Sequence, residues 1–360
     1  MAVNQISDYA AVGTPAPTDT LIVKNKGITK NMTVGQVFEC INKYQTNLEP
    51  DLTDQILGDD TGLVKITFQQ ILTYVESIVK GYVYGGKDGS ANILQDNDQY
   101  SADADTWANK TSLPTPARMQ LAASTILNKG YVFGGGILDT TGSQDTDEYT
   151  ASTDAWANKT DMPTPVRHRH AAMTISDKGY TVAGASTIYL LQDTDEYTST
   201  TDVWDNKTDK PDPAAQFLSG STINTAGYVF GGNPSFADTD KYDPDVWTSK
   251  SNIPSAIYGH VSFTMGDKAY VTGGLKKVGG FLSDVYEYDP DTWTAKTSMS
   301  ASGRSVPAAT KILGGGYVFG GIASSGYLKD TNEYREDTWT AMTDMPTPTR
   351  GYFAASTMHT

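Results

Sequence analysis

Few side chains in this sequence have the type and spacing that chemistry requires. Among its four histidines, His168 and His170 are two residues apart in RHRH, so on a strand they would share one face and could ligate a metal. The single cysteine, Cys40, is distant in the sequence and completes no ligand set. The matching positions of the preceding repeat are Met119 and Leu121. We therefore predict that both histidines are solvent-facing repeat positions and that no metal binds.

Charged residues also recur at fixed places. Acidic pairs such as Asp145/Asp147 and Asp193/Asp195 could hold calcium, but alternation along one strand explains their spacing more simply. Arginines precede short apolar segments at Arg118, Arg167, Arg304 and Arg350. Sialidases use an arginine triad with an acid and a tyrosine, but recurrence in separate repeats indicates a structural role here.

The sequence contains no phosphate-binding loop, nucleophile elbow or metal-spaced cluster. We therefore predict a protein that is not an enzyme, with no catalytic residue and no cofactor. Its net charge of −15 argues against nucleic acid or anionic lipid as a partner, because both favour a basic surface. No apolar run approaches the roughly 20 residues of a membrane span, and the start MAVNQISDYAAVG lacks the features of a signal peptide. We expect synthesis in a cytoplasm without secretion by a signal peptide.

Two phrases recur together along the chain. GYVFGG and its variants begin at residues 81, 130, 179, 227, 269 and 316. A second phrase, typified by TDEYTASTDAWANKTDMPTP at 146–165, contains all the tryptophans: Trp107, Trp156, Trp204, Trp247, Trp293 and Trp339. A spacing of 42 to 49 residues, kept by both markers over six copies, is typical of propeller blades.

Each copy divides into four strand-like segments. In the second copy these segments are 121–128, 130–135, 145–150 and 154–160. The paired glycines after the second segment allow a sharp turn, because glycine adopts positive φ easily. Four short antiparallel strands form one propeller blade.

The double glycine, the tyrosine of DEY, the later tryptophan and the closing MP…R resemble kelch repeats over roughly residues 81–360. Ala183 departs from the double glycine, and aspartate rather than asparagine precedes each tryptophan. The resemblance implies a β-propeller in which each tryptophan lies on the outer strand of its blade and packs against the neighbouring blade. A galactose-oxidase-like copper site is excluded, because Cys40 lies outside the repeats.

The ring is predicted to close through the end of the chain. FQQILTYVESIVK at 68–80 has helical spacing, so the first copy lacks its first strand. RGYFAASTMHT at 350–360 matches RMQLAASTILN at 118–128. We predict that the last strand completes the first blade of a mainly-β, six-bladed propeller and removes the exposed sheet edge.

Residues 1–80 form the other predicted domain, a small α+β region. Its two related units, 18–44 and 53–78, each read as a hairpin that turns at a glycine and runs into a helix. The predicted helices span 34–44 and 68–80.

The stretch PTDTLIVKNKGITKNMTVGQVF resembles the opening of many tail, fibre and appendage proteins of tailed phages. In that family the segment attaches the protein to the virion. The resemblance implies a virion protein of the tail, fibre or head surface that binds other virion proteins through residues 1–80. Its propeller would then contact a host-surface glycan or protein, and the sequence leaves open whether the chain forms a homo-oligomer.

Two other functions stay open, an intracellular kelch module for protein interactions and a propeller enzyme that acts on sugars. The copies differ most in the loops after the double glycines, which we predict to be the binding face. The candidate aromatic residues in these loops are Tyr189, Phe236, Phe281 and Tyr327.

Overall fold

The computed structural model describes residues 78–234, 236–299 and 303–360, together with the backbone of four short strands nearer the N-terminus. The chain divides into two compact units, Met1–Val79 and Lys80–Thr360.

The first unit contains one antiparallel sheet in the order β2-β1-β3-β4. The strands are β1 (Thr20–Asn25), β2 (Ile28–Thr33), β3 (Gln55–Leu57) and β4 (Lys65–Thr67). The strands pair as two hairpins, β1 with β2 and β3 with β4. The helices predicted over 34–44 and 68–80 lie outside the described residues, except that the second prediction overlaps β5, which begins at Val79.

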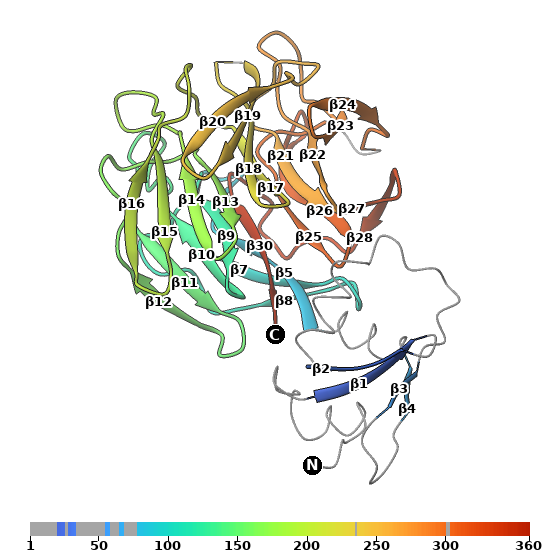
Figure 1. Ribbon diagram of the computed structural model, residues 1–360. Helices are drawn as coiled ribbons and strands as arrows, with labels where there is room; N and C mark the ends of the chain where they lie inside the picture. The colour runs from blue at the N-terminus through green and yellow to red at the C-terminus, as the bar shows by residue number, and fades with distance from the viewer. Residues whose placement is uncertain are drawn as a thin grey trace. The chain divides into compact units, whose positions relative to one another are not determined.

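The second unit is a ring of six four-stranded blades, seen in Figure 1. Blade one comprises β30 (Ala354–His359), β5 (Val79–Tyr84), β7 (Asn97–Ser101) and β8 (Thr106–Asn109). Blade two comprises β9 (Ala122–Ile126), β10 (Lys129–Phe133), β11 (Thr146–Thr150) and β12 (Ala155–Lys159). Blade three comprises β13 (Ala171–Ile175), β14 (Lys178–Val182), β15 (Thr194–Thr198) and β16 (Val203–Lys207).

Blade four comprises β17 (Ser219–Ile223), β18 (Ala226–Gly232), β19 (Phe236–Asp243) and β20 (Val246–Lys250). Blade five comprises β21 (Val261–Met265), β22 (Lys268–Thr272), β23 (Val285–Asp289) and β24 (Thr292–Lys296). Blade six comprises β25 (Ala308–Ile312), β26 (Gly315–Ala323), β27 (Gly326–Arg335) and β28 (Thr338–Met342). A short pair, β6 (Lys87–Asp88) with β29 (Arg350–Gly351), lies beside blade one.

The predicted closure is confirmed, because the C-terminal strand β30 lies next to β5 in the sheet of blade one. The first-named strand of each blade is the innermost, and these six strands contact one another around the axis. The last-named strand is the outermost and carries the tryptophan.

The double glycine is required where the second strand of a blade ends. Gly134 and Gly135 have φ of 49° and 105°. A Cβ on Gly134 would lie 2.7 Å from the backbone oxygen of Arg167, closer than real Cβ atoms approach. In blade three, Ala183 adopts the same left-handed conformation, with φ of 58°.

Each tryptophan joins its blade to the preceding one through a hydrogen bond. The indole Nε1–H donates to a backbone carbonyl just beyond the outer strand of the preceding blade, at 2.8–2.9 Å. The pairs are Trp107 with Thr343, Trp156 with Thr111, Trp204 with Thr160, Trp247 with Thr208, Trp293 with Ser251 and Trp339 with Thr297. The indole rings are half-buried.

The aspartate two residues before each tryptophan completes the joint. Asp154 accepts the backbone N–H of Thr111 from the preceding blade at 2.9 Å and the hydroxyl of Tyr149 from its own blade at 2.6 Å. Burial by itself would raise the pKa of Asp154, but these hydrogen bonds lower it below its ordinary value. The same backbone bond recurs at all six joints, including the one from Thr343 to Asp105 that closes the ring.

The four repeated arginines are buried inside separate blades. Each is 0% exposed and pairs with a carboxylate of its own blade. The pairs are Arg118–Asp147, Arg167–Asp195, Arg304–Asp330 and Arg350–Asp98. This placement agrees with a structural role, because the four guanidinium groups do not converge on one site.

Blades four and five replace this pair in different ways. Blade four uses the buried pair Lys210–Asp240, with 2.9 Å between Nζ and Oδ2. Blade five has Ile257 and Tyr286 at the positions of Arg118 and Asp147. Blade five therefore shows that the arginine and the aspartate of this ion pair can both be replaced by uncharged residues in the same fold.

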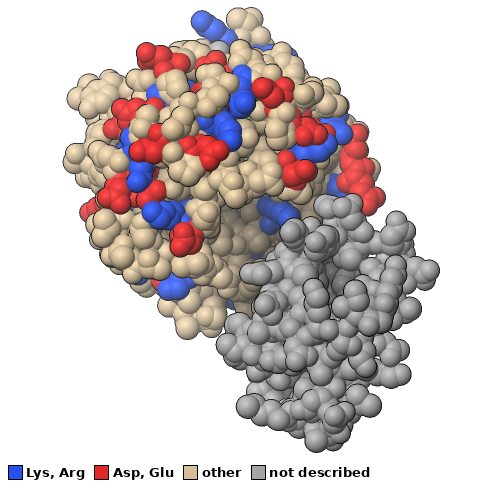
Figure 2. Space-filling view, in the orientation of Figure 1, with Lys and Arg blue, Asp and Glu red and all other residues tan. Residues whose placement is uncertain are grey.

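Surface charge on the propeller is mixed. Figure 2 shows acidic and basic side chains intermingled over the visible face. Ion pairs also link strands within a blade, such as the buried Glu148 with Lys159 at 3.2 Å and Glu287 with Lys296 at 3.2 Å.

The prediction that His168 and His170 face solvent is wrong. Their exposed fractions are 1% and 5%. His170 immediately precedes the inner strand β13, and Leu121, Leu218 and His260 occupy the equivalent positions of other blades. These side chains pack back toward the preceding blade, as shown by the 2.9 Å between His260 Cε1 and a Cβ built on Gly231.

Burial keeps these histidines neutral. Burial lowers the pKa of His260 from 6.5 to about 4. The pKa of His170 also lies well below 6.5, mainly because the side chain is buried and in addition because the charge of Arg167 is near. The cost of charging such a side chain inside the fold makes stability depend on pH.

We expect the His260→Leu variant to tolerate acid better than the unmodified protein. The unfolded chain takes up a proton near pH 6.5 and the folded one only near pH 4, so the stability contributed by neutral His260 is present above pH 6.5 and is lost as the pH falls toward 4. The difference between the two proteins should grow over this range to about 3 kcal/mol. Urea unfolding at pH 7.5, 6, 5 and 4.5 measures it, and parallel pH profiles would contradict the assignment.

Deleting residues 351–360 should prevent cooperative unfolding. The deletion removes β30 and exposes an edge of β5 in blade one and the flank of β25 in blade six, so the open ring should aggregate. Thermal melting and light scattering measure this, with deletion of residue 360 alone as the control. A truncated protein that melts like the full chain would show that the ring does not depend on its last strand.

A double-mutant cycle on Arg118 and Asp147 should reproduce the arrangement of blade five. Arg118→Ile alone leaves a buried carboxylate without its cation and should cost about 3–5 kcal/mol. Adding Asp147→Tyr should recover most of that loss, because Ile257 and Tyr286 already occupy these positions in blade five. Urea unfolding of the two single variants and the double variant gives the coupling, and a double variant no more stable than Arg118→Ile would refute it.

Candidate functional site

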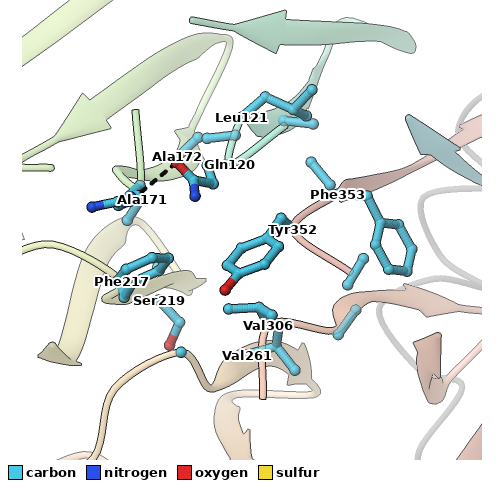
Figure 3. Close-up of a pocket in the computed structure, with 18 of the residues that line it drawn as sticks. Gln120, Leu121, Ala171, Ala172, Phe217, Ser219, Val261, Val306, Tyr352 and Phe353 are labelled. Atoms are coloured by element: carbon cyan, nitrogen blue, oxygen red, sulfur yellow. Dashed lines mark hydrogen bonds between the residues drawn. The ribbon is translucent and has the colours of Figure 1, made fainter. Parts of the chain in front are cut away.

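A cavity occupies the axis of the propeller. It has a volume of about 150 Å³, and all six inner strands or the residues just before them line it. Small residues such as Ala123, Ala172 and Gly220 are part of the lining. Figure 3 shows larger side chains, among them Phe217, Val306 and Tyr352, meeting from different blades.

The mouth of this cavity is built on a closed ring of backbone hydrogen bonds, one from each blade to the next. The N–H groups of Gln120, Arg169, Phe217, Gly259, Val306 and Tyr352 each donate to the carbonyl of the preceding member, and Gln120 donates to Tyr352. The donor–acceptor distances are 2.6–3.0 Å. All six residues have positive φ, between 48° and 64°. We call these six residues the mouth ring.

The mouth ring combines a repeated backbone with different side chains. Five of its members carry a side chain in a left-handed conformation that costs such residues energy. All six blades share the tryptophan, five share the double glycine and four share the buried arginine, yet the mouth ring holds an amide, a guanidinium, two aromatic rings, a valine and a glycine. These equivalent positions line one cavity and differ from blade to blade, unlike the residues that pack the blades together.

Arg169 is the charged member of the cavity lining. Its Nε donates to Gln120 Oε1 at 3.0 Å, its Nη1 to Gln216 Oε1 at 3.0 Å and its Nη2 to the backbone oxygen of Asp139 at 2.8 Å. These three bonds fix the guanidinium in space. Burial lowers the pKa of Arg169, but an arginine side chain keeps its proton in proteins, so the guanidinium is charged.

Two aromatic rings stand next to the guanidinium. Arg169 Cζ lies 4.9 Å from the centre of the Phe217 ring, a cation–π distance. The Phe217 and Tyr352 ring centres are 6.1 Å apart at 45°. In Figure 3 the Tyr352 ring projects into the space between Phe217 and Val306. Burial raises the pKa of the Tyr352 phenol, so it stays protonated.

The predicted loop aromatics lie beside this mouth but are less exposed than expected. In each blade, the residue just before the mouth-ring member forms a β-bridge with the segment that follows the repeated glycines. In blade one this contact is longer, because both Arg350 and Gly351 pair with β6. Tyr189 is 57% exposed. Phe236, Phe281 and Tyr327 are half-buried, because each lies in or next to a strand pairing of its own blade.

Other apolar side chains on these loops are more exposed and were not predicted. They are Leu138 at 61%, Ile188 at 85% and Val278 at 90%. Sequence reasoning concentrated on aromatic residues and overlooked these aliphatic ones. It also overlooked the mouth ring, although the variable residue between the arginine and the apolar strand in RMQL, RHRH and RGYF was a visible signal.

Within 78–234, 236–299 and 303–360, histidine, cysteine and carboxylate side chains form no group of three or more that could hold a metal ion. In the same part of the chain there is no helix with the length and apolar character needed to cross a membrane.

Comparison with known proteins supports the architecture. A family model described as the Kelch motif matches residues 256–300, which include the four strands of blade five. A solved structure described as "Structure of YjhT" is similar with a TM-score of 0.62 and 14% sequence identity, covering 72% of this chain and 96% of that chain. No curated protein matches the sequence. An identity this low shows the fold alone, and residues 80–360 thus form a six-bladed β-propeller with a kelch motif.

Proposed function

We propose that this chain is a recognition protein whose propeller binds a ligand at the mouth of its axial cavity. The observation that carries the proposal is the mouth ring, where the same hydrogen-bonded backbone holds six different residue types around one opening. Scaffolds of this kind place specificity in the residues that vary. The exposed Leu138, Ile188 and Val278 give the surrounding loops apolar area for a larger contact.

We propose binding rather than catalysis at this mouth. General acid–base and nucleophilic chemistry need a titratable or nucleophilic group beside the reacting atoms. The cavity lining supplies the Arg169 guanidinium held by amide groups, the Tyr352 phenol and two serine hydroxyls. Its two histidines pack between blades and form no hydrogen bond with these hydroxyls, so the lining, as far as the structure describes it, contains no paired base and nucleophile. These features favour holding a ligand over transforming it, and they make the sugar-enzyme alternative the weaker one.

We further propose that the protein acts as an appendage of a phage virion. The support is the resemblance of the first unit to virion-docking segments, and its sheet gives strand edges that could pair with another protein. In this arrangement residues 1–79 attach the chain and the propeller presents its mouth to a host surface or to a neighbouring component. An intracellular kelch module is the alternative, and it would use the same mouth without the attachment.

Two fragments cut before β5 test this division of roles. The fragment 1–77 should associate with phage particles that lack the protein, whereas 78–360 keeps all strands of the propeller and should fold but stay free. Sedimentation of particles mixed with each fragment measures association, and circular dichroism with thermal melting measures folding. The intact chain is the positive control. If 78–360 sediments with the particles and 1–77 does not, the attachment role of the first unit is refuted.

A further inference from the structure

We propose that the mouth ring recognises a carboxylate, which Arg169 binds while the ring or alkyl body of the same ligand lies against Phe217 and Tyr352. This inference rests on the proposed recognition function and specifies its ligand class. It assigns Arg169 as the residue that determines specificity. The loop residues around the mouth then add contact area for whatever carries the acid.

The charge of Arg169 is left without a carboxylate partner. Among the described residues, no carboxylate lies within ion-pair distance of its guanidinium, and no acidic side chain lines the cavity. The carboxylate of Asp139, whose backbone oxygen accepts from Arg169, is instead bound by Lys87 Nζ at 3.1 and 3.3 Å. A partly buried cation without its counter-ion favours an anion from outside.

The remaining donors of Arg169 fit two oxygen atoms. A guanidinium has five N–H groups, one on Nε and two on each terminal nitrogen. The structure uses Nε and one N–H from each of Nη1 and Nη2. One N–H therefore remains on each terminal nitrogen, which gives Arg169 two donors for the oxygens of a carboxylate.

The surroundings of these donors suit an apolar body attached to the acid. Phe217 presents its ring at 4.9 Å from Arg169 Cζ, and the Tyr352 ring lies 6.1 Å from that of Phe217. Ala172, Gly220 and similar small residues also line the cavity, which leaves room for a compact ring or branched chain. A highly charged oxyanion such as phosphate would gain nothing from these apolar walls.

A purely structural role for Arg169 makes a different prediction. Its hydrogen bonds also connect Gln120 of blade two with Gln216, which precedes the inner strand of blade four. If this bridge were its whole purpose, the cavity would not distinguish a carboxylate from a neutral group of the same shape. The decisive comparison therefore uses matched ligands on the unmodified full-length protein.

Isothermal titration calorimetry with benzoate and benzamide makes that comparison. Benzoate should bind at least about tenfold more tightly than benzamide, the effect of a charge-assisted pair. Cyclohexanecarboxylate and glucuronate, each against its uncharged amide, distinguish an apolar body from a sugar body, and inorganic phosphate tests for a general preference for anions. Equal binding of benzoate and benzamide, binding of phosphate as tight as benzoate, or no carboxylate binding up to about 10 mM would overturn the proposal.

Two variants localise the effect. Arg169→Gln should weaken benzoate by about tenfold or more and leave benzamide unchanged, since only the charged pair is lost. Lys277→Gln removes the same charge from an exposed loop position of blade five and should change benzoate binding by less than about twofold. Melting temperatures report whether each variant folds, and Arg169→Lys serves as a second variant that keeps the charge but loses the two-pronged geometry. Unchanged benzoate binding in Arg169→Gln would refute the assignment.

The outcome is separable from that of the fragment experiment. Preference for benzoate with a free 1–77 fragment would support the carboxylate site and remove the virion role. Association of 1–77 with particles, together with equal binding of benzoate and benzamide, would support attachment and refute the carboxylate site.

Discussion

The pairing of β30 with β5 is the constraint on which the propeller depends. It places the last strand of the chain in the same sheet as the first strand of the second unit. Only then can Gln120 donate to Tyr352 and Trp107 to Thr343, which complete the inner and outer rings of hydrogen bonds. Loss of this one strand pairing would therefore break hydrogen bonds both at the axis and at the outer rim of the propeller.

Much of the propeller could be predicted because the same contacts between neighbouring blades recur six times. The tryptophans and paired glycines each satisfy a local requirement, a hydrogen bond to the preceding blade or a left-handed turn, so their types repeat and can be read from the sequence. The match between the two ends of the repeat, 350–360 and 118–128, gave the closure for the same reason. Side chains that must be identical in every copy are the ones that sequence comparison within a chain can find.

What escaped prediction depends on the ring as a whole. Positive φ at Gln120, Phe217 or Tyr352 is set by hydrogen bonds to neighbouring blades, and no local signal marks these residues for that conformation. The burial of His168 and His170 likewise follows from the contact between blades, whereas the alternation of a single strand suggested an exposed pair. The loop aromatics were judged by residue type, but burial is decided by how each loop folds back on its own blade.

The position of β5 has a mechanical consequence. It lies between β30 and β7, so it is hydrogen-bonded along both edges. Any tension applied through the segment before Val79 acts on this doubly bonded strand, and extracting it means shearing two ladders at once rather than peeling an edge. A load entering at the start of the propeller is thus shared with the very end of the chain, and the two termini of the ring resist a pull as one unit.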